Sequence, residues 1–507
     1  MAKRSSIGDF LLAGLGTSAC VAGLAALIKG CSPASPDRRA RPNVLLITLD
    51  TTRADALGAY GNPRATTPHL DRIASEGTRF DLAISTAAVT PVSHASILTG
   101  LDNKDHGLRV MSAESGFRLA QDVPTLATVL RGAGYRTIAV HSAFPVSGYF
   151  GLTQGFDVVE SFESRMFAGE DKDKWDVQRF QRRSDETTDL VLGELAKSDE
   201  PYFLWIHYWD PHDGMKLPPE ELLPEDLWHL EDGAKVPTRE QYEAEVRFMD
   251  GEIGRLVEAL RESGAWERTL ALVVADHGQG LGDHGWQHHR ILYQEQIRVP
   301  LLVRVPDAAH VAEVGELVRT TDLFPTVLDY AGVAASRPVD GRSLRRLIAG
   351  ERDEPRLAFA DQINGYDRNA GMIDKRPLDD FLYCVLDRDW KLIYRPANPE
   401  ASELYDLARD PGETRNLYRE RRDQALRLER ELAKHGGWVT EPFAALGSGA
   451  GDSEAAQRAL RSLGYVGGSM ASQDWAWTCP EHREHVASTP GTCPLCSSPL
   501  LLTRPPD

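Results

Sequence analysis

Four short segments of the 507-residue chain bring together carboxylates, imidazoles and hydroxyls, the side chains that bind metal ions and carry out hydrolysis. They are residues 50–53, 90–100, 209–212 and 276–289. Carboxylate and imidazole groups suit Zn²⁺ or, where oxygen ligands dominate, Ca²⁺, Mg²⁺ or Mn²⁺. The chemistry indicated is a divalent-metal site with hydroxyl groups close to it in the sequence.

Each segment alone has an ordinary structural explanation. An Asp just after a strand is commonly a turn or helix-cap residue, and a single His commonly has a structural role. Histidine-rich patches with nearby acids also occur on solvated loops. The combination favours a site, because each cluster lies just beyond a segment that is expected to be a buried strand or in the loop that follows one.

The elements that must position these residues are short apolar runs of strand length. Such unbroken runs are typical of central parallel strands, and they alternate with segments of helical pattern. The strands are expected at residues 43–49, 137–141, 202–208 and 269–275, and the helices at residues 124–131 and 243–263. This alternation predicts an α/β fold with a mostly parallel sheet between helices. Asp50, Asp210 and Asp276 each follow a strand, so they should gather at the sheet edge where ligands bind.

The pattern changes from about residue 354. Short aromatic-rich runs there predict a small antiparallel sheet, and a charged helix is expected over residues 419–435. Another helix is expected over residues 454–463. The predicted organisation is an N-terminal signal or anchor segment, a catalytic domain, a C-terminal subdomain, a linker with a helix, and a cysteine-bearing tail, over residues 1–32, 43–350, 351–440, 441–470 and 471–507.

Composition excludes several classes of protein. A hydrophobic content of 42% with 26% charged residues is an ordinary globular balance, which argues against a disordered, fibrous or multi-span membrane chain. The 57 basic and 75 acidic residues give a net charge of −18. The overall field therefore opposes nucleic acids and anionic membrane surfaces, and no nucleic-acid partner is expected.

The N-terminus has the features of an export or anchoring segment. Lys3 and Arg4 precede nineteen residues, 10–28, that carry no charge. This length lies between a signal-peptide core and a spanning helix, so cleavage and anchoring both stay open. Cys31 adds lipid attachment as an alternative, although Lys29 is a poor residue two places before it. We expect the cell envelope, periplasmic or otherwise extracytoplasmic, with membrane attachment through this segment.

The C-terminal tail contains two pairs of potential metal ligands. Cys479 and His482 form the first pair, and Cys493 and Cys496 follow after ten residues. This spacing indicates a zinc-ribbon-like site, since each pair brings two donors to one tetrahedral ion. Disulfides are the alternative, but three cysteines leave one unpaired. The tail also resembles the small heavy-metal-binding domain of bacterial efflux proteins, although two serines follow Cys496 where that family usually has Gly and Met.

From about residue 43 to residue 467 the chain resembles the sulfatase family of the alkaline phosphatase superfamily. The resemblance rests on motifs that include NVLLITLDTTRADALGAYG, SHASILTGL, ALVVADHGQGLGDHG, LYQEQIRVPLLVR and ELYDLARDPGETRNL. It implies a large α/β domain with a smaller C-terminal sheet subdomain. It also implies a divalent metal and the hydrolysis of anionic esters.

The resemblance also assigns residues. Asp50, Asp276 and His277 match the family's metal ligands, and Thr90 occupies the position of the nucleophile, which also contacts the metal. Sulfatases have a Cys or Ser there that is converted to formylglycine, and Thr cannot be converted. In its Thr and in the following His94, the segment looks more like the branch of nucleotide pyrophosphatases and phosphodiesterases, which attacks with Thr directly.

Further candidates surround this set. His106 is interpreted as structural, and Asp210 with His212 is the candidate for a second metal shell. His212 and His288 are equally interpretable as substrate-oxygen ligands or leaving-group acids. The candidate catalytic residues beside Thr90 are His94, His212 and His288, and the candidate substrate contacts are Arg53, His207 and His289.

The nucleophile position favours one class of ester. A threonine ester has no second hydroxyl with which to expel sulfate, so its hydrolysis requires water to attack the transferred group, as phosphoryl-transfer enzymes achieve. Thr90 therefore favours phosphate or phosphonate esters. The alternatives are a sulfuric ester hydrolase and a non-catalytic envelope protein that binds metal. Small anionic esters, glycans and lipid head groups all stay open as substrates.

Overall fold

An eight-stranded sheet lies at the centre of the part of the chain that the structure describes. The structure is a computed structural model, and it describes residues 41–111, 117–160, 181–197, 201–212, 238–367, 370–440 and 475–504. The expected N-terminal segment and the helix expected at residues 454–463 lie outside these ranges. Within them, no helix combines the length and apolar character that crossing a membrane requires.

The sheet is mostly parallel, as predicted. Its strand order is β4 (Val158–Glu160), β3 (Arg136–His141), β5 (Tyr202–Tyr208), β1 (Asn43–Leu49), β6 (Thr269–Ala275), β7 (Arg298–Arg304), β2 (Thr78–Ile84) and β8 (Glu313–Arg319). Only β7 runs antiparallel to its neighbours β6 and β2. The predicted fold class is confirmed.

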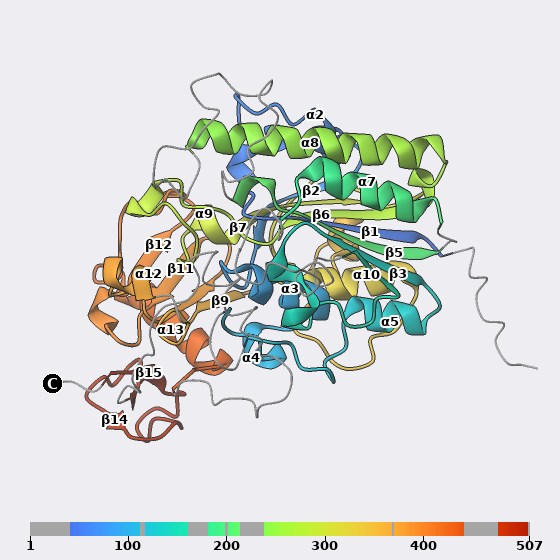
Figure 1. Ribbon diagram of the computed structural model, residues 1–507. Coiled ribbons are helices and arrows are strands. Elements are labelled where there is room, and N and C mark those ends of the chain that lie inside the picture. Colours follow the sequence, from blue (N-terminus) through green and yellow to red (C-terminus); the bar gives the residue numbers. More distant parts are fainter. Residues whose placement is uncertain are drawn as a thin grey trace, which may run out of the picture. The chain divides into compact units, whose positions relative to one another are not determined.

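Helices cover both faces of this sheet, which explains why β1, β5 and β6 are apolar along their whole length. In Figure 1, α2, α7 and α8 lie on one face, and α3, α5 and α10 lie on the other. The described α-helices are α2 (Pro68–Ser75), α3 (Thr90–Thr99), α4 (Asn103–His106), α5 (Leu126–Gly132), α7 (Ser184–Leu195), α8 (Arg239–Glu262), α9 (Gln294–Ile297), α10 (Leu323–Ala331), α11 (Arg345–Ile348), α12 (Ala370–Lys375) and α13 (Arg422–His435). The short 3₁₀ turns are η2 (Ala54–Ala56), η3 (Gly58–Tyr60), η4 (Phe144–Val146), η5 (Gly148–Phe150), η7 (Asp210–His212), η11 (Trp266–Arg268), η12 (Asp283–Gly285), η13 (Thr320–Asp322) and η14 (Pro399–Ala401).

The helix expected from residue 243 begins earlier, at Arg239. Thr238 and Gln241 form a capping box, in which the Thr238 Oγ1 accepts from the Gln241 N–H at 3.2 Å and the Gln241 Oε1 accepts from the Thr238 N–H at 2.9 Å. These two bonds satisfy N–H groups at the start of the helix and fix its first turn.

The strand register aligns the carboxyl ends of β1, β5 and β6. Leu49 at the end of β1 pairs with Tyr208 on one side and with Ala275 on the other. The Asp50 N–H continues the ladder to the Tyr208 carbonyl at 2.8 Å, and the Asp276 N–H donates to the Leu49 carbonyl at 3.2 Å. Asp50 and Asp276 therefore leave adjacent parallel strands side by side.

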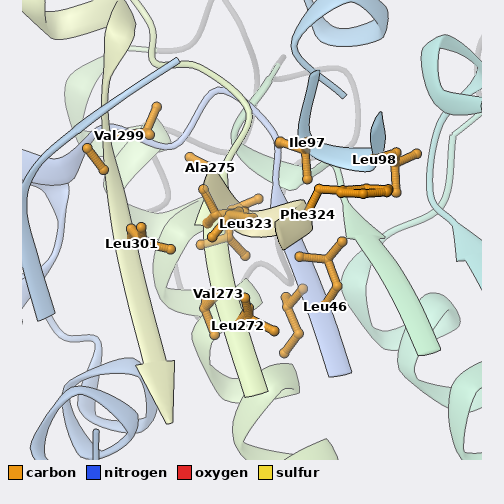
Figure 2. Packing of buried hydrophobic residues seen from close by; sticks show 14 of the residues in the cluster. Leu46, Ile97, Leu98, Leu272, Val273, Ala275, Val299, Leu301, Leu323 and Phe324 are labelled. Atoms are coloured by element: carbon orange, nitrogen blue, oxygen red, sulfur yellow. The ribbon is translucent and has the colours of Figure 1, made fainter. Parts of the chain in front are cut away.

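The core anchors α3, whose first residue is Thr90. Figure 2 shows side chains of α3 (Ile97, Leu98) and of α10 (Leu323, Phe324) near side chains of three strands, which are Leu46 of β1, Leu272 and Val273 of β6, and Leu301 of β7. Gly100 ends α3 with a φ of 69°, and a Cβ there would lie 2.8 Å from the Cβ of Phe324. Only glycine allows this close approach, which holds α3 against α10.

Two smaller antiparallel sheets follow along the chain. The first has the order β12 (Glu403–Asp406), β11 (Trp390–Tyr394), β10 (Leu382–Leu386) and β9 (Ala358–Gln362), which confirms the small sheet predicted after residue 354. The second, in the tail, has the order β14 (Val486–Ala487), β13 (Ala476–Thr478) and β15 (Leu501–Thr503). The domain boundaries given above stay predictions.

Candidate active site

Three predicted metal ligands lie together beyond the carboxyl ends of β1 and β6 in the large sheet. Ligand atoms of Asp50, Asp276 and His277 all lie within 4.8 Å of one another, and all three residues are buried. Two buried carboxylates this close repel each other unless a cation or a proton lies between them. Their donor set, two carboxylates and one imidazole, suits Zn²⁺, Mn²⁺ or Mg²⁺.

The surrounding hydrogen bonds orient these ligands. The Asp276 Oδ1 accepts from the backbone N–H of Thr51 at 3.1 Å and of His277 at 2.7 Å, whereas its buried Oδ2 has no hydrogen-bond partner within the described ranges. The His277 Nδ1 contacts the Gly278 carbonyl at 2.9 Å. Donation to that carbonyl leaves the lone pair on Nε2, as a metal-binding imidazole requires. The residues present therefore fit a divalent cation.

Thr90 joins this group through its hydroxyl. Its Oγ1 lies 3.4 Å from the Asp50 Oδ2 and 3.3 Å from the His277 Nε2. Thr90 begins α3, so its hydroxyl stands at the positive end of a helix, where an anion is favoured. Ser93 does not compete for this place, because its Oγ donates to the carbonyls of Val89 and Thr90.

Two histidines pack behind Thr90 and Asp50. The His207 Nε2 lies 3.2 Å from the Asp50 Oδ2, and the His94 Nδ1 lies 2.7 Å from the Thr90 carbonyl oxygen. Their ring centroids are 5.0 Å apart. Burial lowers the pKa of both imidazoles below the ordinary value, so both are neutral near pH 7. His94 contacts the backbone of Thr90, so it helps to fix the position of that residue at the start of α3.

Another pair of histidines lies on the other side of His277. The ring of His289 is 5.0 Å from that of His277 and 5.5 Å from that of His212, and His212 stacks on Trp209 at 3.7 Å. Burial lowers the pKa of His289 well below its ordinary value. The ring of His288 packs against Trp286 at 5.5 Å. Its carbonyl oxygen accepts hydrogen bonds from the Gly280 N–H and the Gln296 Nε2, which shape the loop.

Two predicted site residues have other partners. Asp210 accepts from the Ser184 N–H at 2.9 Å and from the Ser184 Oγ at 2.5 Å, so it caps α7 and is not among the clustered ligands. Arg53 binds Asp55 at 2.6 Å and Asp283 at 2.7 Å. Its guanidinium lines a separate cavity of about 630 Å³ with those two carboxylates. The roles of Asp210 as a metal ligand and of Arg53 as a substrate contact therefore stay predictions, which these partners do not favour.

His141 is a buried histidine that the sequence reasoning missed. It ends β3 opposite His207 and packs on Trp205 at 4.7 Å. Burial lowers the pKa of His141 to about 3, and neither ring nitrogen has a hydrogen-bond partner among the described residues. Its place as the last residue of an expected strand was the available signal. His106, in contrast, is buried and hydrogen bonded to Ser96, which agrees with a structural role.

The tail brings its four predicted ligands together. Ligand atoms of Cys479, His482, Cys493 and Cys496 lie within 4.8 Å of one another. The Cys479 Sγ is 3.5 Å from the Cys496 Sγ and 3.6 Å from the His482 Nδ1, and the Cys493 Sγ is also 3.6 Å from that nitrogen. Tetrahedral zinc with Zn–S bonds of about 2.3 Å separates its ligands by about 3.6 to 3.8 Å. The sulfurs are too far apart for a disulfide.

The loop that carries His482 docks on α13. Arg483 pairs with the buried Glu429 at 2.8 Å, and Glu481 pairs with Arg430 at 3.0 Å. Glu429 has no exposed side-chain surface, so its charge requires partners within the fold. The residues on either side of His482 thus bind consecutive residues of one helix.

Comparison with known proteins places this site in context. The sulfatase family pattern matches residues 42–333, and the pattern described as N-sulphoglucosamine sulphohydrolase, C-terminal, matches residues 282–435. An N-acetylglucosamine-6-O-sulfatase of Bacteroides thetaiotaomicron is 24% identical over 78% of this chain and 86% of its own length. An arylsulfatase of Clostridium perfringens is 28% identical over 76% of this chain and 92% of its own. The crystal structure of a phosphonate monoester hydrolase of Agrobacterium radiobacter superposes with a TM-score of 0.61 at 22% identity, over 76% of this chain and 94% of its own, which shows a shared fold.

Proposed function

Because the chain belongs to the sulfatase family, we propose that it is a divalent-metal-dependent hydrolase of anionic esters that uses Thr90 as its nucleophile. We further propose that it prefers phosphate or phosphonate esters to sulfate esters. The observation that carries the proposal is the position of the Thr90 Oγ1, 3.3 Å from the His277 Nε2 and 3.4 Å from the Asp50 Oδ2. A hydroxyl in that position would lie beside a cation held by those ligands.

Asp50, Asp276 and His277 would hold that cation, whose charge lowers the pKa of a neighbouring hydroxyl and offsets the negative charge of the ester. Thr90 then loses its hydroxyl proton to solvent and attacks the phosphorus atom, so that a bond forms from its Oγ1 while the bond to the leaving oxygen breaks. The N-terminus of α3 receives the anionic group, and His212, whose ring lies 5.5 Å from that of His289, supplies a proton to the leaving oxygen. Water then attacks phosphorus and releases Thr90.

The preference for phosphorus follows from this second step. Water can attack a threonine phosphate at phosphorus, so the hydroxyl is regenerated. A threonine sulfate lacks the second hydroxyl through which formylglycine expels sulfate. We expect repeated turnover on aryl phosphate, phosphonate and phosphodiester substrates, and slow or single turnover on the matched aryl sulfate.

Steady-state hydrolysis of these four matched esters tests the preference. Intact-mass measurement after incubation with the sulfate should detect an adduct that maps to Thr90. If sulfate turnover is sustained and exceeds turnover on every phosphorus ester, the chain acts as a sulfatase and the proposal is wrong.

A sulfuric ester hydrolase is the second candidate. It is favoured by the relatives named above, two of which are sulfatases matched over most of their length. Those proteins act on a sulfated sugar and on aryl sulfates, as their names say. A non-catalytic metal-binding protein is opposed by the retained ligand cluster and by the hydroxyl beside it.

We also propose a glycan, a lipid head group or a small anionic ester as the natural substrate, met in the cell envelope. The N-terminal charge pattern and the apolar run that follows it support this location. Membrane fractionation of cells that express the full chain, compared with a chain lacking residues 1–32, tests it. Equal distribution of both proteins would contradict it.

For the tail we propose one structural zinc ion held by Cys479, His482, Cys493 and Cys496. Four protein ligands close a tetrahedral site, so the ion has no open position for chemistry. Replacing both Cys493 and Cys496 by serine should remove about one zinc equivalent and leave ester hydrolysis intact. The metal content and kcat of the full-length variant measure this, and a loss of kcat would assign the tail to the active site instead.

A further inference from the structure

Arg290 has a backbone conformation that side chains rarely adopt. Its φ is 83°, in the left-handed region, and only 2% of its surface is exposed. A non-glycine residue is strained there and persists only where its surroundings enforce the conformation. Arg290 directly follows His289, whose ring lies beside His277. The strain is thus adjacent to the catalytic cluster.

The C-terminal subdomain supplies the groups that enforce this conformation. The Arg290 Nη1 pairs with the Asp367 Oδ2 at 2.5 Å, and the side chains are 3% and 0% exposed. The Asn364 Nδ2 donates to the Arg290 carbonyl at 3.0 Å and to the Asp379 carbonyl at 2.8 Å. The Asp367 carboxylate also accepts from the Met111 N–H at 3.2 Å. Residues of the C-terminal subdomain therefore bind both the side chain and the carbonyl of Arg290.

The preceding residue is held from the catalytic domain. The His289 Nδ1 lies 3.1 Å from the Ala88 carbonyl oxygen, two residues before Thr90. The Trp286 Nε1 donates to the His289 carbonyl at 2.8 Å. These bonds fix the ring of His289 through Ala88 and its backbone carbonyl through Trp286. The strained Arg290 follows directly in the chain.

We propose that Arg290 and Asp367 are positioning residues whose buried ion pair holds residue 290 in the left-handed conformation and so places the His289 imidazole beside His277, where it borders the substrate. This inference rests on the proposed function. The C-terminal subdomain would then contribute residues that shape the active site, because Asn364 and Asp367 follow β9 and belong to that subdomain. Arg290 acts through His289 and does not itself contact substrate.

Removing one partner of a buried ion pair also destabilises the protein, so stability alone is not a test. A positioning role requires that the effect pass through His289. We therefore compare Asp367→Asn, His289→Gln and the double variant, with Arg290→Lys as the conservative replacement that retains a charge for Asp367. Glu429→Gln serves as the control, because Glu429 is a buried, paired carboxylate of the same subdomain that does not contact this loop.

Two measurements are made on the metal-loaded full-length enzyme. The first is the affinity for inorganic phosphate by titration calorimetry, which needs no turnover. The second is kcat and KM on the best aryl ester. Asp367→Asn should weaken phosphate binding and lower kcat/KM by about tenfold or more, a typical size for a misplaced site group. Arg290→Lys should keep phosphate affinity and kcat/KM much closer to those of the wild type, and Glu429→Gln should change the melting temperature only.

The double variant decides between the explanations. If Asp367 acts through His289, Asp367→Asn should add nothing to His289→Gln in phosphate affinity, because the coupled effects are not additive. Fully additive losses, or an Asp367→Asn enzyme with wild-type phosphate affinity, would overturn the inference. An enzyme that binds phosphate in this pattern yet hydrolyses none of the esters would refute the proposed function and leave the positioning role supported.

Discussion

Replacing Thr90 by alanine is expected to abolish multiple turnover, with a fall in kcat of at least about 1,000-fold, because removal of a covalent nucleophile leaves only the contribution of binding and electrostatics. The fold should survive, since Thr90 begins α3 and its Oγ1 contacts only Asp50 and His277 among the described residues. Steady-state hydrolysis of the aryl phosphorus esters, with the melting temperature as the measure of folding, checks this result.

Two further variants separate the hydroxyl from the helix. Thr90→Ser keeps a hydroxyl on the same atom and should retain turnover within about one order of magnitude, as expected when the reacting group itself is conserved. Thr99→Ala removes a hydroxyl from the other end of the same helix, where Oγ1 donates to the Ala95 carbonyl at 2.6 Å, and should leave kcat unchanged. A Thr90→Ala enzyme with more than a tenth of wild-type kcat would mean that another group is the nucleophile.

The sheet and the cluster of candidate metal ligands were predictable, because both follow from the positions of the buried parallel strands. The apolar runs of β1 and β6 identify buried parallel strands, and parallel strands that end in register bring the residues after them together. Asp50 and Asp276 follow those two ends, so their proximity follows from local sequence and a simple packing rule. His277 comes with Asp276 as its neighbour in the chain.

The other site assignments depend on contacts that local sequence does not contain. Asp210 also follows a strand, but its carboxylate is taken by Ser184, which lies in a separate segment of the chain. Arg53 is likewise taken by Asp283, more than two hundred residues away. A strand-end carboxylate that caps a helix and one that binds a metal look alike in sequence, and only the tertiary partners distinguish them.

The choice between His288 and His289 shows the same limit. Adjacent residues of a loop point in different directions, and the left-handed conformation of Arg290 decides which imidazole lies beside His277. That conformation is held by Asp367 and Asn364. The sequence of the loop does not predict this conformation, because the strained position is not a glycine.

The tail presents the opposite case. Its ligand spacing predicted the grouping of Cys479, His482, Cys493 and Cys496, since two close pairs can reach one ion from a short loop. The docking of the same loop on α13 was not predictable, because Glu429 belongs to a charged helix of ordinary appearance. In the fold its carboxylate is buried and contacts Arg483, Arg422 and Tyr418.

Replacing Asp276 by asparagine is expected to remove metal from the catalytic cluster and, with it, turnover. The substitution preserves the shape of the side chain and its acceptance of the Thr51 and His277 N–H groups, but it removes the charge of a direct ligand. The affinity for the metal should fall by more than the 10- to 100-fold that loss of an outer-shell partner costs. Asp50→Asn should behave in the same way, because both carboxylates belong to the cluster.

Metal-dependent stabilisation gives a readout that does not require activity. A ligand that binds only the folded state stabilises it by about 2.7 kcal/mol at a hundred times its dissociation constant, so added metal should raise the melting temperature of the wild type. In Asp276→Asn that rise should shrink to the part due to the tail site. Without metal, the variant should be as stable as the wild type or more so, because one of two repelling buried carboxylates has been neutralised.

Asp210→Asn is the matched control, since it changes another carboxylate beyond a strand of the same sheet. It weakens the cap of α7 at Ser184 and should lower the melting temperature with and without metal alike, while the metal content and kcat stay near those of the wild type. The opposite pattern, metal lost in Asp210→Asn and retained in Asp276→Asn, would reverse the two assignments. The pair of variants therefore tests which strand-end carboxylate binds the ion and which one caps a helix.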